Sequence, residues 1–170
     1  MTTATEAAHD AERVLKRVWQ WGEASLRLPV DPVRIARNLG IDVYQAHLDQ
    51  NVYAALVKEP GQDPTILLNA IDSPNRQRFS CAHEIGHFMR HSDDEYEYLD
   101  RRDMLSSGGN DPEEVYANNF AACLLMPEDE VRRLSRQGAT DFDLAVTFDV
   151  SREAMNYRLM NLRLRHAGRD

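Results

Sequence analysis

The residues best suited to chemistry are two histidines and a glutamate in the string His83-Glu84-Ile85-Gly86-His87. Histidines four positions apart lie on one face of a helix, one turn from each other. Two imidazoles in this arrangement can bind one zinc ion. The glutamate then lies beside the first ligand, where it can accept a proton from a water activated by the metal. The string therefore predicts a zinc site with His83 and His87 as ligands and Glu84 as the general base.

The surroundings of the string favour this interpretation over an ordinary pair of histidines on a solvated or core helix face. Phe79 and Phe88 make the neighbourhood apolar. Gly86 destabilises a helix by about 1 kcal/mol relative to alanine, and a helix bears that loss more readily where a backbone or a ligand approaches closely. We therefore expect a buried site on a helix that runs from about Ser73 to His91.

A catalytic zinc usually has three protein ligands and one open position, so a third ligand is needed. His91 is nearest, but it lies a further turn along the same helix, too far to close a tetrahedral site. A histidine at a helix C-terminus is also favoured by the helix dipole. Glu114 shares the apolar face of a later helix with Asn118, where an unpaired carboxylate would be costly. Glu114 fits a capping box with Asp111 equally well, so the residues alone leave both roles open.

Supporting roles are predicted for a few polar residues near these candidates. Asn118 is suited to orient a metal ligand, or to be a buried amide bonded to backbone. Tyr116 and His91, together with Tyr96 and Tyr98, are weaker candidates for contact with a substrate or an oxyanion, and surface or core roles suit each of them equally well.

The elements that position these side chains follow from apolar periodicity and capping residues. Helices are expected at about 7–19, 32–39, 73–91, 111–126, 128–137, 142–148 and 152–165, and strands at Ile41–Tyr44, Val52–Lys58 and Thr65–Leu68. The last two strands are expected to pair antiparallel, with Val52–Lys58 as an exposed edge that takes the substrate as an added strand. Ser92–Asn110 is acidic and then Gly/Ser-rich, which predicts a mobile surface loop. This order of elements is that of an α+β fold with a small antiparallel or mixed sheet.

Composition restricts the partners of the chain. A net charge of −8 over 170 residues disfavours a general polyanion binder, because phosphate binding needs clustered lysines and arginines. We expect no membrane segment, since no long apolar run occurs. Cys81 and Cys123 are expected to be reduced thiols, and the first residues do not resemble a secretory signal. These features favour a cytoplasmic protein.

Two segments, Arg78–His87 and Glu114–Pro127, resemble the ImmA/IrrE family of metallo-endopeptidases, and the resemblance extends from about Pro29 to Pro127. It implies a minimal zincin-like fold and implies that Glu114 is the third zinc ligand. Manganese could replace zinc at such a site of two nitrogens and one oxygen. Family members typically cleave a helix-turn-helix repressor encoded beside them. The resemblance therefore implies a repressor as substrate and relief of repression of a mobile element or a stress response.

The chain is expected to have two parts, a zinc metallopeptidase core at 1–127 and a helical C-terminal subdomain at 128–170. Within the second part, Asp143–Leu159 is similar to a helix-turn-helix segment, with Arg152 and Arg158 facing outward. Direct DNA binding and docking of a protein partner both remain open for this part. The alternative function for the whole chain is a non-proteolytic metal-binding module, either regulatory or half of a toxin–antitoxin pair. The intact Glu84 argues against it, because a purely structural site has no use for a base.

Overall fold

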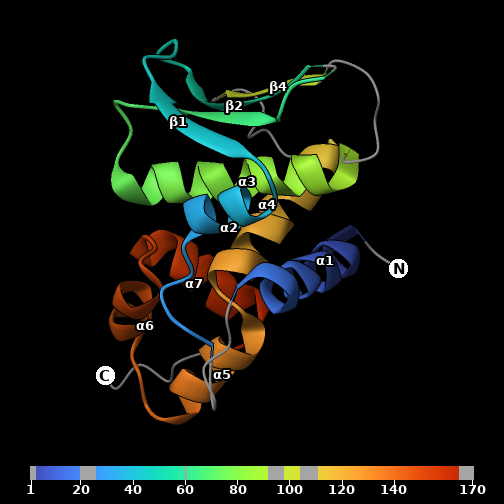
Figure 1. Cartoon of the computed structure of the whole chain (residues 1–170). Coiled ribbons are helices and arrows are strands. Elements are labelled where there is room, and N and C mark those ends of the chain that lie inside the picture. Colours follow the sequence, from blue (N-terminus) through green and yellow to red (C-terminus); the bar gives the residue numbers. More distant parts are fainter. Residues whose placement is uncertain (1–2, 20–25, 60, 92–97, 104–110, 165–170) are drawn as a thin grey trace.

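The computed structural model describes residues 3–19, 26–59, 61–91, 98–103 and 111–164, and it describes only the backbone of 98–103. In chain order the elements are α1 (Thr3–Val18), α2 (Pro32–Asn38), β1 (Asp42–Ala46), β2 (Val52–Lys58), β3 (Thr65–Asn69), α3 (Pro74–His91), β4 (Tyr98–Asp103), α4 (Pro112–Leu125), α5 (Glu128–Arg136), α6 (Asp141–Phe148) and α7 (Arg152–Asn161). They form the α+β fold that the sequence predicts (Figure 1).

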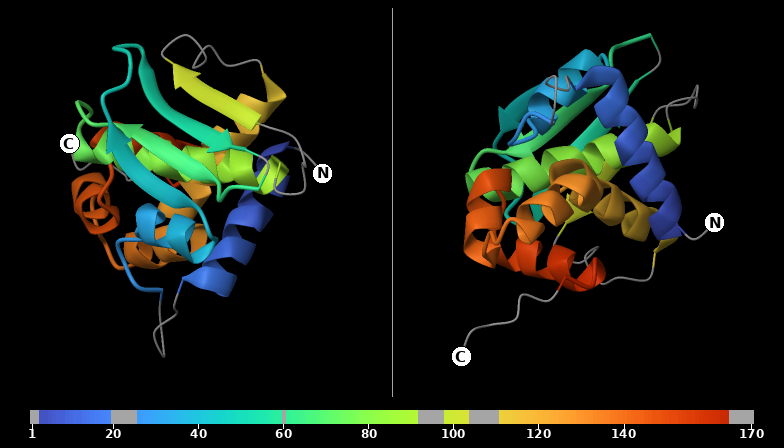
Figure 2. Two further views of the ribbon diagram at one scale, coloured as in Figure 1. Left: turned by 45° about the horizontal axis from the view of Figure 1, so that its top comes forward. Right: turned by 90° about the horizontal axis from the view of Figure 1, so that it is seen from below.

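A four-stranded mixed sheet forms one layer, with its strands in the order β1-β3-β2-β4. β1 runs parallel to β3, and β2 runs antiparallel to both of its neighbours. α3 crosses beneath the sheet in contact with β2 and β3, and α4 packs against α3 in the layer below (Figure 1). Seen from below, α1 and the C-terminal helices lie on either side of α4 (Figure 2). α3 and α4, which carry the predicted ligands, are therefore the central pair of helices.

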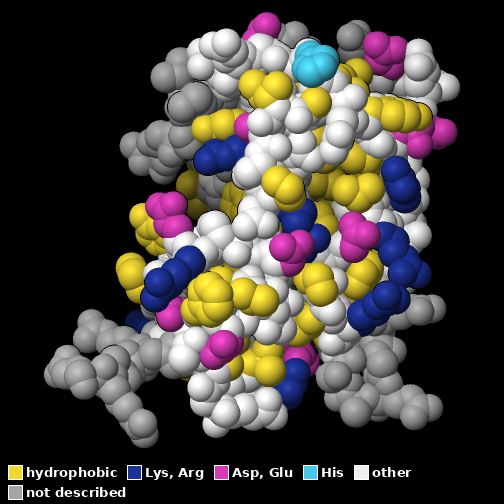
Figure 3. All heavy atoms as spheres, turned by 90° about the vertical axis from the view of Figure 1, so that its left-hand side faces the viewer, with side chains coloured by type: hydrophobic (Ala, Val, Ile, Leu, Met, Phe, Trp, Pro, Cys, Tyr) yellow, Lys and Arg dark blue, Asp and Glu magenta, His cyan; other side chains and the backbone are white. Residues whose placement is uncertain are grey.

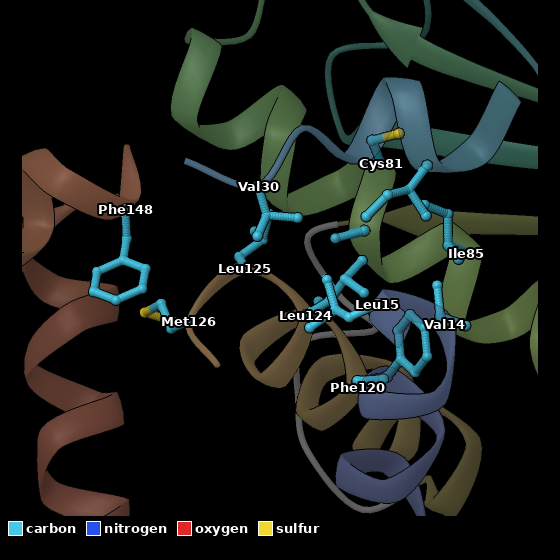
Figure 4. Packing of buried hydrophobic residues seen from close by; sticks show 14 of the residues in the cluster. Val14, Leu15, Val30, Cys81, Ile85, Phe120, Leu124, Leu125, Met126 and Phe148 are labelled. Carbon is cyan, nitrogen blue, oxygen red and sulfur yellow. The ribbon is translucent and has the colours of Figure 1, made fainter. Parts of the chain in front are cut away.

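Buried apolar side chains hold these layers together. Val14 and Leu15 of α1 meet Ile85 of α3 and Phe120 of α4 in one cluster (Figure 4). The same cluster continues to Phe148 of α6 and to the buried side chains of α7. Burial of this kind contributes roughly 25 cal/mol per Å² of apolar surface, and it fixes the helices as one packed body. The predicted division of the chain at residue 127 stays a prediction.

The prediction of a loop at Ser92–Asn110 is wrong for part of its length, because Tyr98–Asp103 forms β4. The six residues pair antiparallel with β2, from Lys58 opposite Tyr98 to Val52 opposite Asp103. A charged sequence of this kind is a poor strand by pattern, but charged residues are common on edge strands. β4 forms because it pairs with β2, which is distant in the sequence, and the residues of β4 themselves do not predict this pairing.

A second correction follows for the sheet edge. Val52–Lys58 was expected to be exposed for an added strand, but β2 lies between β3 and β4 and has partners on both sides. The edges of the described sheet are β1 and β4. Any peptide added to the sheet as a strand must therefore pair with one of those two.

The C-terminal helices have strong local signals. Thr140 and Asp143 form a reciprocal capping box at the start of α6, and Ser151 caps α7 by accepting a hydrogen bond from the backbone N–H of Ala154. Asp149 takes the left-handed conformation at the turn, with φ of 52°, where a helix-turn-helix segment usually has glycine. Aspartate adopts this conformation more readily than most residues, so the turn forms without glycine.

One prediction for these helices is wrong. Arg158 was expected to face outward, but its side chain is buried, and its Nε donates a hydrogen bond of 3.0 Å to the carbonyl of Met126. The carbonyl belongs to the C-cap residue of α4, which cannot bond within its own helix. The arginine is therefore used to join α7 to the end of α4.

The tightest contact between α3 and α4 occurs at Gly86. A Cβ atom at this position would lie 3.1 Å from the Cα of Ala117 and 3.2 Å from the Cδ1 of Phe120. The close backbone approach that the sequence suggested at this glycine is therefore made by α4. Absence of a side chain lets the two ligand-bearing helices touch.

We predict that Gly86→Ala destabilises the protein, by up to about 2 kcal/mol. Overpacking a core typically costs about 1–3 kcal/mol, and the better helix propensity of alanine returns about 1 kcal/mol. Urea unfolding of the metal-free protein measures the difference in free energy. If the unfolding free energy of Gly86→Ala equals or exceeds that of the unmutated chain, α3 and α4 can move apart enough to accept the added methyl group without loss of stability.

Candidate metal centre

Three side chains from two helices converge at the centre of the molecule. The Nε2 atoms of His83 and His87 lie 2.9 Å apart, and Glu114 places its Oε1 3.2 Å from the Nε2 of His87 and its Oε2 3.5 Å from that of His83. One donor atom from each residue lies within 4.8 Å of the other two. A tetrahedral ion with bonds of about 2.1 Å holds its ligand atoms about 3.4 Å apart. The observed separations lie on both sides of that value, so the three residues fit one divalent ion.

The cluster is shielded from solvent. His83 and His87 are at most 1% exposed and Glu114 is 8% exposed. Hydrogen bonds with His83 and His87 hold the pKa of the Glu114 carboxyl well below its usual value, against the opposing effect of burial. A metal ligand must be deprotonated, so this environment keeps the Glu114 carboxylate ready to bind a cation.

The geometry also bears on the alternative role of Glu114 as part of a capping box. Asp111 caps α4 by accepting a hydrogen bond from the backbone N–H of Glu113, and the Glu114 carboxyl turns toward the histidines instead of back to the helix start. The packing of α4 on α3 thus brings Glu114 to the cluster, which the sequence alone could not decide.

Asn118 lies behind the first histidine. Its Oδ1 is 3.1 Å from the Nδ1 of His83. An amide oxygen can only accept, so Nδ1 carries a proton, and the neutral ring that a metal ion binds then has its Nε2 lone pair toward the cluster. Asn118 thereby selects the tautomer that a metal ligand needs and fixes the plane of the ring.

Glu84 has no exposed surface and lies on α3 directly after His83. At 100° per residue, its side chain leaves the helix about 80° from the mean direction of the two histidines. Glu84 therefore does not share the direction of the two histidines, and it is not one of the three donors.

The other sequence candidates lie outside the cluster. His91 ends α3, with its Nε2 3.5 Å from the Oε2 of Glu113. Tyr116 is fully buried, and its hydroxyl donates a hydrogen bond of 2.7 Å to Asp10 of α1. Burial raises the pKa of this phenol. The side chains of Tyr96 and Tyr98 are outside the described residues.

A charged network next to the cluster was not found from the sequence. The guanidinium of Arg90 contacts both carboxyl oxygens of Glu113, at 3.0 and 3.4 Å, and Glu6 of α1 at 3.1 Å. It also lies over the ring of Tyr116, 4.4 Å from its centre. The hydrogen bond from Arg90 lowers the pKa of Glu113. This network could have been found from the sequence, because Arg90 follows the predicted ligand His87 by three residues and Glu113 directly precedes the predicted ligand Glu114.

The chain belongs to the family of the IrrE N-terminal-like domain, Peptidase M78, whose model matches residues 36–160. The resemblance drawn from the sequence is thus confirmed, and the match reaches past Pro127 into α7. All three cluster residues and Glu84 lie within it.

Two proteins illustrate the likeness. The chain is 28% identical to the uncharacterized immunity region protein 2 of Bacillus phage phi105 over 123 residues. These residues are 72% of this chain and 75% of the phage protein. A Mycobacterium tuberculosis transcriptional regulator has a similar structure, with a TM-score of 0.60 and 18% identity over 91% of this chain. This chain spans 46% of the regulator, and the likeness shows the fold alone. Among the described residues, no helix is both long and apolar enough to cross a membrane.

We predict that Asn118→Ala weakens metal binding about 10–100-fold, because His83 loses the partner that fixes its tautomer and orientation. Competition with a chromophoric chelator measures the dissociation constant. Asn119→Ala is the control, since the amide of Asn119 donates to the carbonyl of Val115 on its own helix and does not contact His83. Equal metal affinity in both variants would exclude the orienting role.

Proposed function

We propose that this protein is a metal-dependent endopeptidase that hydrolyses peptide bonds at the His83–His87–Glu114 cluster. The observation that carries the proposal is the convergence of two imidazole nitrogens and one carboxylate, with the buried Glu84 beside them, within the span of a peptidase family. A purely structural zinc site normally closes all four positions with protein side chains. Three protein ligands leave a position for water or substrate, which favours a catalytic site.

Zinc is the metal we propose. Two histidines and one glutamate are a ligand set that zinc peptidases use, and manganese is the alternative for nitrogen and oxygen donors. When bound, the ion supplies Lewis-acid activation of a water molecule and of the scissile carbonyl.

The side chains of the chain perform the proton transfers. Glu84 takes the proton from the attacking water as the new C–O bond forms, and delivers it to the leaving nitrogen as the C–N bond breaks. Asn118 holds His83 so that the Nε2 lone pair of the ring points to the metal site. His87 and Glu114 would supply the other two donor atoms, and the Glu114 carboxylate would offset part of the positive charge of the ion. The low exposure of these groups strengthens each electrostatic contact.

We propose a helix-turn-helix repressor encoded nearby as the substrate, and with it relief of repression in the cytoplasm. Similarity to a protein whose name places it in a phage immunity region supports this substrate class. Cys81 and Cys123 are free thiols, which suits a reducing compartment.

We predict that Glu84→Gln keeps the metal but lowers cleavage by at least a hundredfold, because an amide cannot accept the proton. The test incubates the zinc-loaded protein with the adjacently encoded repressor and identifies the fragments by mass spectrometry. Chelator should abolish cleavage, and added zinc should restore it. Glu12→Gln, at an exposed position on α1, serves as the control.

The same experiment separates the peptidase from a regulatory module. A repressor that binds the zinc-loaded protein but stays intact would favour the non-proteolytic module, in either its regulatory or its toxin–antitoxin form. Cleavage by Glu84→Gln at the unmutated rate would remove Glu84 from the mechanism.

A further inference from the structure

A groove beside the metal centre carries a further inference, which rests on the proposed peptidase function. We propose that the groove between α3, α4 and α7 binds an extended segment of the substrate on one side of the scissile bond and takes a large apolar side chain. The C-terminal helix α7 would then be a wall of the substrate site.

The groove has a volume of about 640 Å³, within the usual range for ligand sites. Its apolar lining includes Phe79 of α3, Ala122 and Met126 of α4, and Ala154 and Tyr157 of α7. This volume is larger than one side chain needs, so it suits a short stretch of polypeptide.

Helix geometry places the groove next to the metal centre. Phe79 precedes His83 by four residues on α3, and Ala122 follows Asn118 by four on α4, so each helix carries the groove and the cluster on one face. Asn118 lines the groove and also contacts the Nδ1 of His83. A peptide in the groove would therefore lie against the amide that holds His83, next to the metal centre.

The wall formed by α7 is firmly attached. Arg78 of α3 donates hydrogen bonds to the carbonyls of Asp149, at 3.0 Å, and Phe148, at 3.4 Å, in the turn that precedes α7. The buried Arg158 bonds the end of α4. A wall held at both ends can form a binding site of fixed shape.

The chemistry of the lining favours peptide over nucleic acid. Amide and hydroxyl groups of Asn75, Asn161 and Ser151 line the groove and can bond a peptide backbone. The charged side chains of the lining are mixed, since Glu153 lines the groove together with Arg76 and Arg158. Side chains of both charges are mixed with hydrophobic ones on the face shown in Figure 3. Phosphate binding needs a concentration of positive charge, and Arg158, the arginine most central to α7, is buried.

The test fills the groove. Ala154→Trp places a large ring against the apolar floor, and Asn156→Trp, on the same helix at an exposed position outside the lining, is the matched control. The zinc-loaded proteins are given a library of defined twelve-residue peptides, and mass spectrometry gives the cleavage sites. We expect Ala154→Trp to lower kcat/KM at least tenfold, mainly through KM, and to remove an apolar preference on one side of the bond. Metal affinity should stay unchanged.

Cleavage of the same peptides with the same preference by Ala154→Trp would overturn the proposal. Ala122→Leu fills the floor from α4 and gives a second route if the first variant unfolds. If the unmutated protein cleaves no peptide, the proposal is tested by binding instead: the peptide library is passed over the immobilised zinc-loaded protein, and the retained peptides are identified. Apolar peptides held by the unmutated protein and lost by Ala154→Trp support the groove; no retention, or equal retention, overturns it. A salt-sensitive shift of duplex DNA that Ala154→Trp abolishes would assign the wall to nucleic acid.

Discussion

The contact between α3 and α4 at Gly86 is the constraint on which the site depends. Histidines four residues apart are properties of a single helix, but a third ligand must come from another segment, at a distance set by the approach of the two backbones. With no Cβ at Gly86, the Cα of Ala117 comes close enough for Glu114 to meet both histidines. A wider separation would leave the carboxylate within its own helix, free to act as a cap.

The layers on either side of this pair serve to hold it. The sheet covers α3, and α1 covers α4 through an apolar face and the hydrogen bond from Tyr116 to Asp10. Arg90 joins α1, α3 and α4 at the ligand end through Glu6 and Glu113. α1 precedes the residues 36–160 that the family model matches.

The features that the sequence predicted are those with local signals. Three features depend on neighbouring residues, and each lies close to where it was expected: the helix that carries His83 and His87, the helix that begins at Pro32, and the strand Thr65–Asn69. β4 and the role of Glu114 depend on distant partners. A charged hexapeptide becomes a strand only because β2 has a free side, and a glutamate in the first turn turns to the histidines only because α4 packs on α3.

The buried Arg158 shows why the presence of arginines on a helix is a poor guide to surface charge. An arginine count measures positive potential only when the guanidinium groups face solvent. Here Arg158 bonds the carbonyl of Met126, and Arg132 of α5 bonds that of Leu162. Both carbonyls lie at helix ends, where four acceptors lack partners within the helix. Arg158 and Arg132 therefore stabilise the joins between neighbouring helices.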